Sequence, residues 1–181
     1  MTAHGHRFEA SNMCKLKSEE RRRLQPPQGI VDFAAPSPHA IAADLGCGNG
    51  YVAVPLSKHV RRLLAVDAQK EMLQAIEGDA MDRIVADVQA LPFHKGAFDH
   101  AFMVSVAHEF EDLGAVLGRI REIVGKGGRL TIVEHQKKET PFGPPMHERI
   151  DHAEILSVCQ GWKELRFLDA EAHYQMELEA E

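Results

Sequence analysis

The sequence predicts an α/β fold, a doubly wound and mostly parallel sheet with helices on both faces. From about residue 40 onward, short apolar runs alternate with stretches whose apolar residues recur at helical spacing. Several of the runs end in glycine, aspartate or histidine, as strands of such sheets do where they meet a ligand. The last two β-like runs have no helical pattern between them, so we expect an antiparallel hairpin at one edge of the sheet.

The elements follow in order from this alternation. Strands are expected at residues 40–45, 63–66, 83–86, 100–104 and 129–133, with the closing pair at 163–168 and 173–178. Helices are expected at residues 51–59, 69–77, 113–124 and near 150–159, and residues 136–147 are expected to be irregular. The helix at 113–124 has the clearest pattern, because its apolar residues form one stripe and Gly125 follows it.

The composition predicts one globular domain in the cytoplasm. The chain has 181 residues with 44% hydrophobic side chains, enough for a single core, and a formal net charge of −6. No apolar run approaches the ~20 residues that span a bilayer, and the first residues lack the apolar segment of a signal peptide.

Residues 1–39 are charged and contain several prolines, so we expect an N-terminal helical lid segment over the ligand edge of a domain at 40–181. Cys14, Cys47 and Cys159 are far apart without a CxxC pattern, which predicts neither disulfides nor a zinc site.

The stretch D-L-G-C-G-N-G-Y at residues 44–51 lies directly between the first expected strand and the first expected helix. Its glycines at positions 46, 48 and 50 allow a sharp turn and a close approach of the backbone to a ligand. A nicotinamide dinucleotide site requires G-x-G-x-x-G with a small last residue, and Tyr51 in that position disfavours an NAD-dependent oxidoreductase. For an isolated match, a glycine turn without a ligand stays the alternative.

Two further acids stand at the ends of the next two strands. Asp67 ends the run at 63–66, where a carboxylate can accept both hydroxyls of a ribose. Asp87 ends the run at 83–86, where it can accept an amino N–H while Val88 packs on a base. Either aspartate alone is more commonly a cap or a solvated turn residue. Together with the glycine turn they predict a nucleoside ligand.

On these residues the sequence resembles the class I S-adenosylmethionine-dependent methyltransferases, nearest to the type of the ubiquinone and menaquinone biosynthesis methyltransferases (methyltransferase type 11 domain). The resemblance covers about residues 40–135 and rests on AADLGCGNGY at 42–51, LAVD at 64–67, ADVQALPF at 86–93, FDHAFMVSVAHEF at 98–110 and GKGGRLTI at 125–132. It implies a Rossmann-like seven-stranded sheet in the order 3-2-1-4-5-7-6 with strand 7 antiparallel. The chain has no inserted substrate domain, so acceptor recognition is expected from the N-terminal segment and the loops after strands four and five.

The resemblance also implies the binding residues for the cofactor S-adenosylmethionine and its product S-adenosylhomocysteine. The turn of Gly46, Gly48 and Gly50 would cradle the methionine half, with Asp44 near its amino group. Asp67 would hold the ribose hydroxyls, and Asp87 with Val88 would meet the adenine amino edge. The other implied residues are Cys47 and Asn49 in the turn, Ala68, Gln69 and Met72 beside the adenine, and Met103, Val104 and Ser105 at the sulfonium end.

Methyl transfer is an in-line displacement in which the protein chiefly positions the reactants and sometimes supplies a base. His108, just after the fourth strand, is the candidate catalytic base, because the ordinary pKa of imidazole is about 6.5; capping a helix or ordering a loop is its alternative role. Glu109 and His135 are further candidates on the acceptor side, where residues 136–147 are expected either to form a wall or to be a solvated connection. The arginines at 21–23 are either a carboxylate clamp or a solvated helix face.

The sequence leaves the acceptor open. The compact chain favours a small molecule. The residues M-V-S-V at 103–106 lack the N-P-P-Y pattern of base-amino methylation, and the chain is acidic, so a nucleic acid is disfavoured. A protein or RNA acceptor and a non-catalytic protein that only binds the cofactor stay open. No metal is expected, because Asp112 stands where H-E-x-x-H requires histidine. The oligomeric state and the methylated element stay undetermined.

Overall fold

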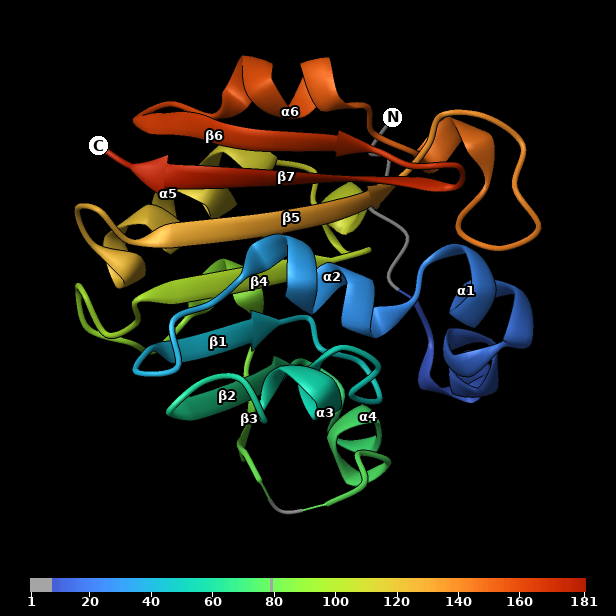
Figure 1. The fold of residues 1–181 in the computed structure, drawn as a ribbon, viewed down its shortest axis with the longest axis horizontal. Helices are drawn as coiled ribbons and strands as arrows, with labels where there is room; N and C mark the ends of the chain where they lie inside the picture. Colours follow the sequence, from blue (N-terminus) through green and yellow to red (C-terminus); the bar gives the residue numbers. More distant parts are fainter. Residues whose placement is uncertain (1–7, 79) are drawn as a thin grey trace.

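A seven-stranded sheet forms the centre of the protein (Figure 1). The computed structural model describes residues 8–78 and 80–181. The strands are β1 (Ile41–Leu45), β2 (Arg62–Asp67), β3 (Asp82–Val85), β4 (His100–Val104), β5 (Arg129–His135), β6 (Trp162–Asp169) and β7 (His173–Ala180). They lie in the order β3-β2-β1-β4-β5-β7-β6, and β7 is antiparallel to both of its neighbours. The predicted fold class, strand order and edge hairpin are confirmed.

Helices cover both faces of this sheet. One face carries α2 (Pro27–Ala34), α3 (Ala53–Leu56) and α4 (Lys70–Gln74), and the other carries α5 (Leu113–Val124) and α6 (His152–Val158). The connecting segments contain α1 (Glu19–Leu24) and the 3-10 helices η1 (Ala10–Lys17), η2 (Val88–Ala90), η3 (Ala107–Glu109) and η4 (Met146–Glu148). Figure 1 shows α1 beyond the arrowheads of β1 and β4, so the N-terminal segment stands at the carboxyl edge of the parallel strands.

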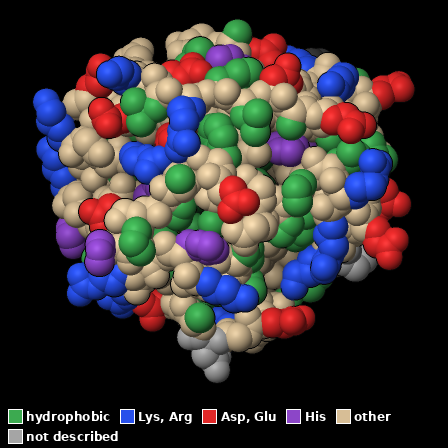
Figure 2. All heavy atoms as spheres, in the orientation of Figure 1, with side chains coloured by type: hydrophobic (Ala, Val, Ile, Leu, Met, Phe, Trp, Pro, Cys, Tyr) green, Lys and Arg blue, Asp and Glu red, His purple; other side chains and the backbone are tan. Residues whose placement is uncertain are grey.

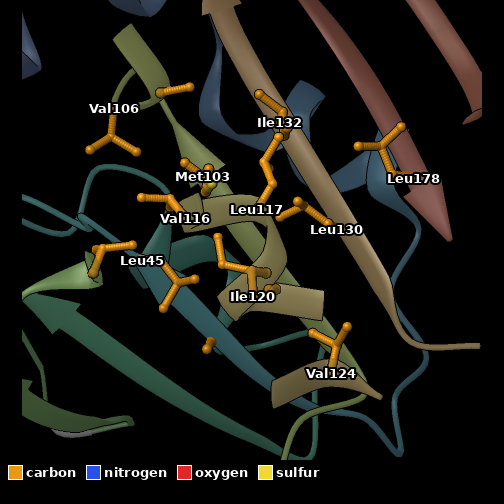
Figure 3. Close-up of a cluster of buried hydrophobic side chains, with 14 of the residues drawn as sticks. Leu45, Met103, Val106, Val116, Leu117, Ile120, Val124, Leu130, Ile132 and Leu178 are labelled. Atoms are coloured by element: carbon orange, nitrogen blue, oxygen red, sulfur yellow. The ribbon is translucent and has the colours of Figure 1, made fainter. Parts of the chain in front are cut away.

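The apolar stripe of α5 fills the core on its face of the sheet. Figure 3 shows Leu117 and Ile120 directed at Leu130, Ile132 and other strand side chains. Strand residues alternate between the two faces, so every second residue of β4, β5 and β7 reaches this core. Burying a side chain of this size stabilises the fold by about 1.5–3 kcal/mol. The predicted boundaries of this helix are confirmed, and Asp112 caps it by accepting a hydrogen bond from the Ala115 N–H at 2.8 Å.

The opposite face is packed by α2, whose Ile30, Val31 and Ala34 are buried in a second core with Leu56 and Phe102. This helix is therefore a structural layer of the domain. Of the predicted lid at residues 1–39, the segment that lies over the ligand edge ends before α2, and residues 1–7 lie outside the described part of the chain.

Two helices are shorter than predicted, spanning 53–56 instead of 51–59 and 70–74 instead of 69–77. In α3, Pro55 has no N–H to donate, and the Ser57 hydroxyl binds the Val54 carbonyl at 2.9 Å. The backbone then continues in a tighter turn, in which the Lys58 N–H donates to the Pro55 carbonyl at 3.2 Å and the His59 N–H to the Leu56 carbonyl at 2.9 Å. In α4, Gln69 is extended because its side chain is bonded to the N-terminal segment. Amphipathic spacing indicated both helices but not where side-chain hydrogen bonds end them.

Candidate active site

A cavity of about 700 Å³ lies at the carboxyl edge of the strands. Its walls come from the segments that follow β1, β2, β3, β4 and β5, together with η1, α1 and the loop at 136–148. This is the usual position of ligand sites in open α/β sheets, and the volume is within the range of small-molecule sites. Sixteen of the predicted site residues line it: Asp44, Gly46, Cys47, Gly48, Asn49, Asp67, Ala68, Gln69, Met72, Asp87, Val88, Val104, Ser105, His108, Glu109 and His135.

The remaining two predicted residues, Gly50 and Met103, do not line the cavity. Gly50 adopts φ +79° and packs against Ile76. Met103 is fully buried, and Figure 3 shows it in the α5 core near Val116 and Leu117. Its place follows from strand alternation, because Val104 and Met103 must point to opposite faces of the sheet.

The glycine turn after β1 is held against the end of β2. The backbone N–H groups of Gly46 and Cys47 donate to the Val66 carbonyl at 2.8 and 3.0 Å. Gly46 has φ +73°, and a Cβ there would lie 2.6 Å from Cγ2 of Val106. A side chain is therefore excluded at this position both by the backbone conformation and by space.

Asp67 joins the turn to the next loop. Its Oδ2 accepts a hydrogen bond from the Gly48 N–H at 2.9 Å, and its Oδ1 accepts one from the Gln69 N–H at 2.8 Å. Each carboxylate oxygen has a second lone pair, so Asp67 can accept two further hydrogen bonds from a ligand in the cavity.

Several residues that line this cavity carry buried polar atoms without a hydrogen-bond partner. Among the described residues, the buried side-chain atoms without a hydrogen-bond partner include Asp44 Oδ1, Asn49 Oδ1, Ser105 Oγ and His135 Nδ1, and all four residues line the cavity. Buried polar groups are normally satisfied, and leaving one unpaired costs about 1–3 kcal/mol. These atoms are suited to a polar ligand that supplies the missing partners.

Asp44 is the most perturbed acid of the site. It is 2% exposed, and burial, followed by the nearby charge of Asp67, raises its pKa from 3.8 to about 7, against an opposing effect of Arg21. A cationic ligand group beside Asp44 would restore the ordinary carboxylate state. Asn49 lies in the same turn, with its amide nitrogen donating to the Met13 carbonyl at 3.1 Å.

Arg21 is the one member of the 21–23 arginine cluster that lines the cavity. Its guanidinium stacks over the Tyr51 ring at 4.3 Å and donates to Gln25 Oε1 at 2.9 Å. Burial lowers its pKa from 12.5 to about 10, so Arg21 stays charged at neutral pH. Tyr51 in turn donates its hydroxyl to the Gln25 carbonyl at 2.9 Å. The tyrosine that disfavours a dinucleotide site thus positions a cation at the cavity.

At the end of β4, Ser105 adopts φ +56°, a conformation that non-glycine residues rarely take. Its backbone N–H donates to the Val133 carbonyl at 2.7 Å, which keeps the turn attached to β5. Such strain concentrates at functional sites, where the surrounding structure compensates its cost.

A buried carboxylate lies beside two histidines that line the cavity. Glu134, near the end of β5, is 1% exposed. Its carboxylate is hydrogen-bonded to His108 Nδ1 at 2.9 Å and accepts a hydrogen bond from the Ala107 N–H at 2.7 Å. Its neighbour His135 lies edge-on to His108, with ring centroids 6.3 Å apart, and edge-on to Phe142. Burial lowers the pKa of His135 to about 3, so His135 is neutral.

His108 and Glu134 each offset the effect of burial on the pKa of the other. Burial alone would lower the pKa of His108, but the charge and hydrogen bond of Glu134, then Glu109 and Glu148, raise it above 6.5. Burial alone would raise the pKa of Glu134, but His108 and then His135 lower it. The pair therefore favours the ionised carboxylate of Glu134 and the protonated form of His108.

Hydrogen bonds to Gln69 and Glu109 also hold the N-terminal segment over the site. Gln69 accepts from the Ala10 N–H at 2.9 Å and donates to the Phe8 carbonyl at 2.6 Å, and the Phe8 N–H donates to Glu109 Oε1 at 3.3 Å. This segment therefore bridges the ends of β2 and β4 across the cavity.

The sequence-based prediction missed Glu134 and Phe142. Glu134 directly follows the expected strand at 129–133, and an acid at such a strand end is the signal that could have found it. Phe142 lies in the irregular loop, where the sequence pattern assigns no direction to a side chain.

Residues 43–132 match a family described as a methyltransferase domain. The chain carries a methyltransferase domain. Over 116 residues it is 30% identical to the uncharacterized methyltransferase YcgJ of Bacillus subtilis, covering 60% of this chain and 45% of that protein. It is 26% identical to a demethylmenaquinone methyltransferase of Corynebacterium glutamicum, covering 75% and 54% of the two chains. The domain thus spans about half the length of the curated relatives it matches.

The methyltransferase fold extends over nearly the whole chain. A crystal structure of a SAM-dependent methyltransferase from Aquifex aeolicus has a TM-score of 0.87 at 20% identity, covering 95% of this chain and 98% of that one. The predicted family and fold are confirmed. Within residues 8–78 and 80–181, no group of three or more His, Cys, Asp or Glu is placed to hold a metal ion. No helix in that part of the chain is long and apolar enough to cross a membrane.

Proposed function

We propose that the cavity binds S-adenosylmethionine and that the domain transfers its methyl group to a small-molecule acceptor. The observation that carries the proposal is the glycine turn after β1, which lies against Asp67 and, in this cavity, beside the unpartnered oxygens of Asp44 and Asn49. Those groups match a nucleoside with an amino acid attached.

The lining residues divide into parts that suit the parts of this cofactor. Asp67 would hold the ribose hydroxyls, and Asp44 with Asn49 would receive the ammonium group of the methionine half. Arg21 would pair with the carboxylate, an assignment that its charge and its stacking on Tyr51 support. The adenine would lie among Ala68, Gln69, Met72, Asp87 and Val88, and the sulfonium end beside Val104 and Ser105.

When bound, the cofactor supplies a sulfonium methyl group, and the electron pair of the broken C–S bond stays on sulfur. The protein positions and desolvates the reacting centre, which is the usual basis of such transfer. His108, Glu109 and His135 line the cavity and would lie on its acceptor side. His108 is the group that would remove a proton from an acceptor that carries one.

The small size of the acceptor is supported by the enclosure of the site. The N-terminal segment and the loop at 136–148 both contribute lining residues, among them Leu16 and Phe142. On the face drawn in Figure 2, basic and acidic side chains are interspersed without a broad basic surface. One relative is named for demethylmenaquinone, which is also a small molecule.

Calorimetric titration with S-adenosylmethionine, S-adenosylhomocysteine and NAD tests the cofactor. We expect micromolar binding of the first two and none of NAD. Asp67→Ala should weaken binding about 100-fold, because two hydrogen bonds to a charged acceptor contribute about 3 kcal/mol. Asp32→Ala, an exposed aspartate on α2, is the matched control and should bind as the parent chain does.

Binding of NAD alone would refute the proposal. A non-catalytic binding protein is distinguished by label transfer from methyl-tritiated cofactor to a panel of small molecules, proteins and RNA. Label recovered only in macromolecules would overturn the small-molecule assignment. Cofactor binding without label in any acceptor would favour the binding protein.

A further inference from the structure

The carboxylate of Glu134 has an unusually complete set of donors. Besides the Ala107 N–H, the backbone N–H groups of His135 and His108 lie 3.2 and 3.4 Å from its oxygens. Both oxygens also lie within 3.1 Å of one atom, His108 Nδ1. Because an ionised carboxylate only accepts hydrogen bonds, the imidazole proton in this contact must be on Nδ1. The other ring nitrogen, Nε2, is then the acceptor, on a side chain that lines the cavity.

We propose that Glu134 is a positioning residue that holds His108 in the Nδ1–H tautomer and so presents Nε2 to the methyl acceptor as a proton acceptor. This inference rests on the proposed function and assigns a role to a residue that does not itself line the cavity. Glu134 acts through His108 and does not touch the reacting atoms.

The proton balance of the step is simple. An acceptor X–H gives its proton to His108 Nε2 while X forms its bond to the methyl carbon, and the bond from that carbon to sulfur breaks with its electron pair left on sulfur. His108 becomes an imidazolium with protons on both nitrogens, and the negative charge of Glu134, 2.9 Å from Nδ1, stabilises it. The imidazolium then releases the Nε2 proton to solvent, which restores the starting tautomer.

Titratable groups on several neighbouring elements bear on His108, and Arg149 acts on both Glu134 and His135. Glu134 and His135 come from β5, Glu109 from η3, Glu148 from η4, and Arg21 from α1 acts on both Glu134 and His135. The three glutamates favour the imidazolium, so the pKa of His108 is raised and its base form becomes abundant only above pH 6.5. His135, neutral and edge-on, adds no positive charge.

The substitution Glu134→Gln distinguishes a role of Glu134 in setting the His108 tautomer from a purely structural role in holding η3 against β5. The glutamine carbonyl can still accept from the Ala107 N–H, so the turn at η3 keeps its attachment to β5. Its amide group, however, donates toward His108 Nδ1, which must then accept and move the proton to Nε2. Glu134→Asp keeps a carboxylate and should retain the Nδ1–H tautomer. A purely structural role would predict no change of tautomer with Gln.

The experiment is a ¹⁵N NMR titration of the histidine rings, with and without S-adenosylhomocysteine. His108→Asn assigns the His108 signals by their disappearance. We expect Nδ1–H in the parent chain and in Glu134→Asp, and Nε2–H in Glu134→Gln with a pKa lower by about 1–3 pH units. The matched control is Glu164→Gln, which alters another His–Glu pair, His152 Nε2 with Glu164 Oε2 at 3.0 Å, outside the cavity lining. It should leave the His108 signals unchanged.

The outcomes are decisive in either direction. An Nε2–H tautomer in the parent chain, or an unchanged tautomer and pKa in Glu134→Gln, overturns the inference even if S-adenosylhomocysteine binds. If Glu134→Gln fails to fold, the tautomers of the parent chain and Glu134→Asp still decide. Failure of S-adenosylhomocysteine to bind the parent chain refutes the proposed function, a result separate from the tautomer measured without ligand.

Discussion

Asp44 links cofactor binding to pH through its own burial. Its pKa is raised from 3.8 to about 7, so in the folded protein it holds a proton that the unfolded chain has already lost between these values. The contribution of Asp44 to stability therefore falls as pH rises through this window and is lowest above pH 7. Asp44→Asn should raise the unfolding free energy of the cofactor-free protein by up to about 4 kcal/mol at pH 8 and by almost nothing near pH 4.

Urea unfolding of both chains at pH 4 and pH 8 measures this difference. A ligand titration provides the control, because Asp44 is charged at pH 8 and should pair with the ammonium group. Asp44→Asn should therefore bind S-adenosylhomocysteine at least 10-fold more weakly at pH 8, and the two chains should converge at pH 5. A stability difference that does not vary with pH would contradict the perturbed pKa.

The sequence could predict that a residue lies at the site when this depends on the end of a single strand. It could not do so when the residue acts through a partner distant in the sequence. Asp44 stands near the end of an apolar run, Asp67 and Asp87 directly follow one, and each of the three lines the cavity. Glu134 also follows such a run, but its partner His108 is 26 positions away. Its direction follows from strand alternation with Ile132 only once β5 is known to continue to His135. The individual binding roles stay predictions.

At the scale of the element, the glycine turn contains a backbone conformation that residues with a side chain adopt only at a cost in free energy. Gly46→Ala requires alanine at φ +73° and places its Cβ 2.6 Å from Val106. We expect a loss of about 2–5 kcal/mol in unfolding free energy from the left-handed backbone and the overlap together. Thermal and urea denaturation measure it.

Gly118→Ala in α5 is the matched control, because its Cβ would meet nothing within 4 Å and the position is helical. Alanine should stabilise the protein there by about 0.5–1 kcal/mol. Equal effects of the two substitutions would show that the turn tolerates a side chain.

The boundaries of a helix were predictable where its apolar stripe is long and were not predictable where the helix is short. A sustained apolar stripe and Gly125 define α5, and its boundaries agree with the prediction. The four residues of α3 are too few to form a stripe, so hydrogen bonds such as that of Ser57 decide where it ends. Tertiary contacts likewise set the start of α4 at Lys70, because Gln69 is bonded to Phe8 and Ala10.

At the scale of the whole molecule, three histidines among residues 8–78 and 80–181 are buried in neutral form. Burial lowers the pKa of His100 to about 3, of His135 to about 3 and of His173 to about 4. Each must take up a proton on unfolding below pH 6.5, so each contributes a stability loss of about 1.4 kcal/mol per pH unit as the pH falls. Asp44 has the opposite effect on this pH dependence, because its raised pKa makes it release a proton on unfolding over the same range.

The net expectation is therefore a loss of about 3 kcal/mol per pH unit between pH 6 and pH 4.5. Urea unfolding across this range tests it. His100→Asn should reduce the slope by about 1.4 kcal/mol per pH unit, whereas His39→Asn, at an exposed position, should leave it unchanged. A slope that increases in His100→Asn would contradict a neutral His100.

His100 belongs to a buried polar cluster that joins the amino ends of the central strands. Its Nε2 lies 2.8 Å from Thr131 Oγ1, and Glu177 on β7 pairs with both Arg129 and Arg166. Arg129 also donates to the Ala34 carbonyl at the end of α2 at 2.7 Å. The sequence predicted the strands that carry these residues and their order, but not which side chains meet, because that depends on the register between β5 and β7, in which Thr131 lies opposite Glu177.

The insertion of β7 between β5 and β6 also has a consequence for synthesis on the ribosome. Translation delivers β6 before β7, yet β6 has only β7 as its neighbour in the sheet. A nascent chain that ends before His173 can pair β1 to β5 but must leave β6 and one edge of β5 without partners. Exposed strand edges recruit other chains. During translation, this stretch is therefore where a chaperone would have the most to protect.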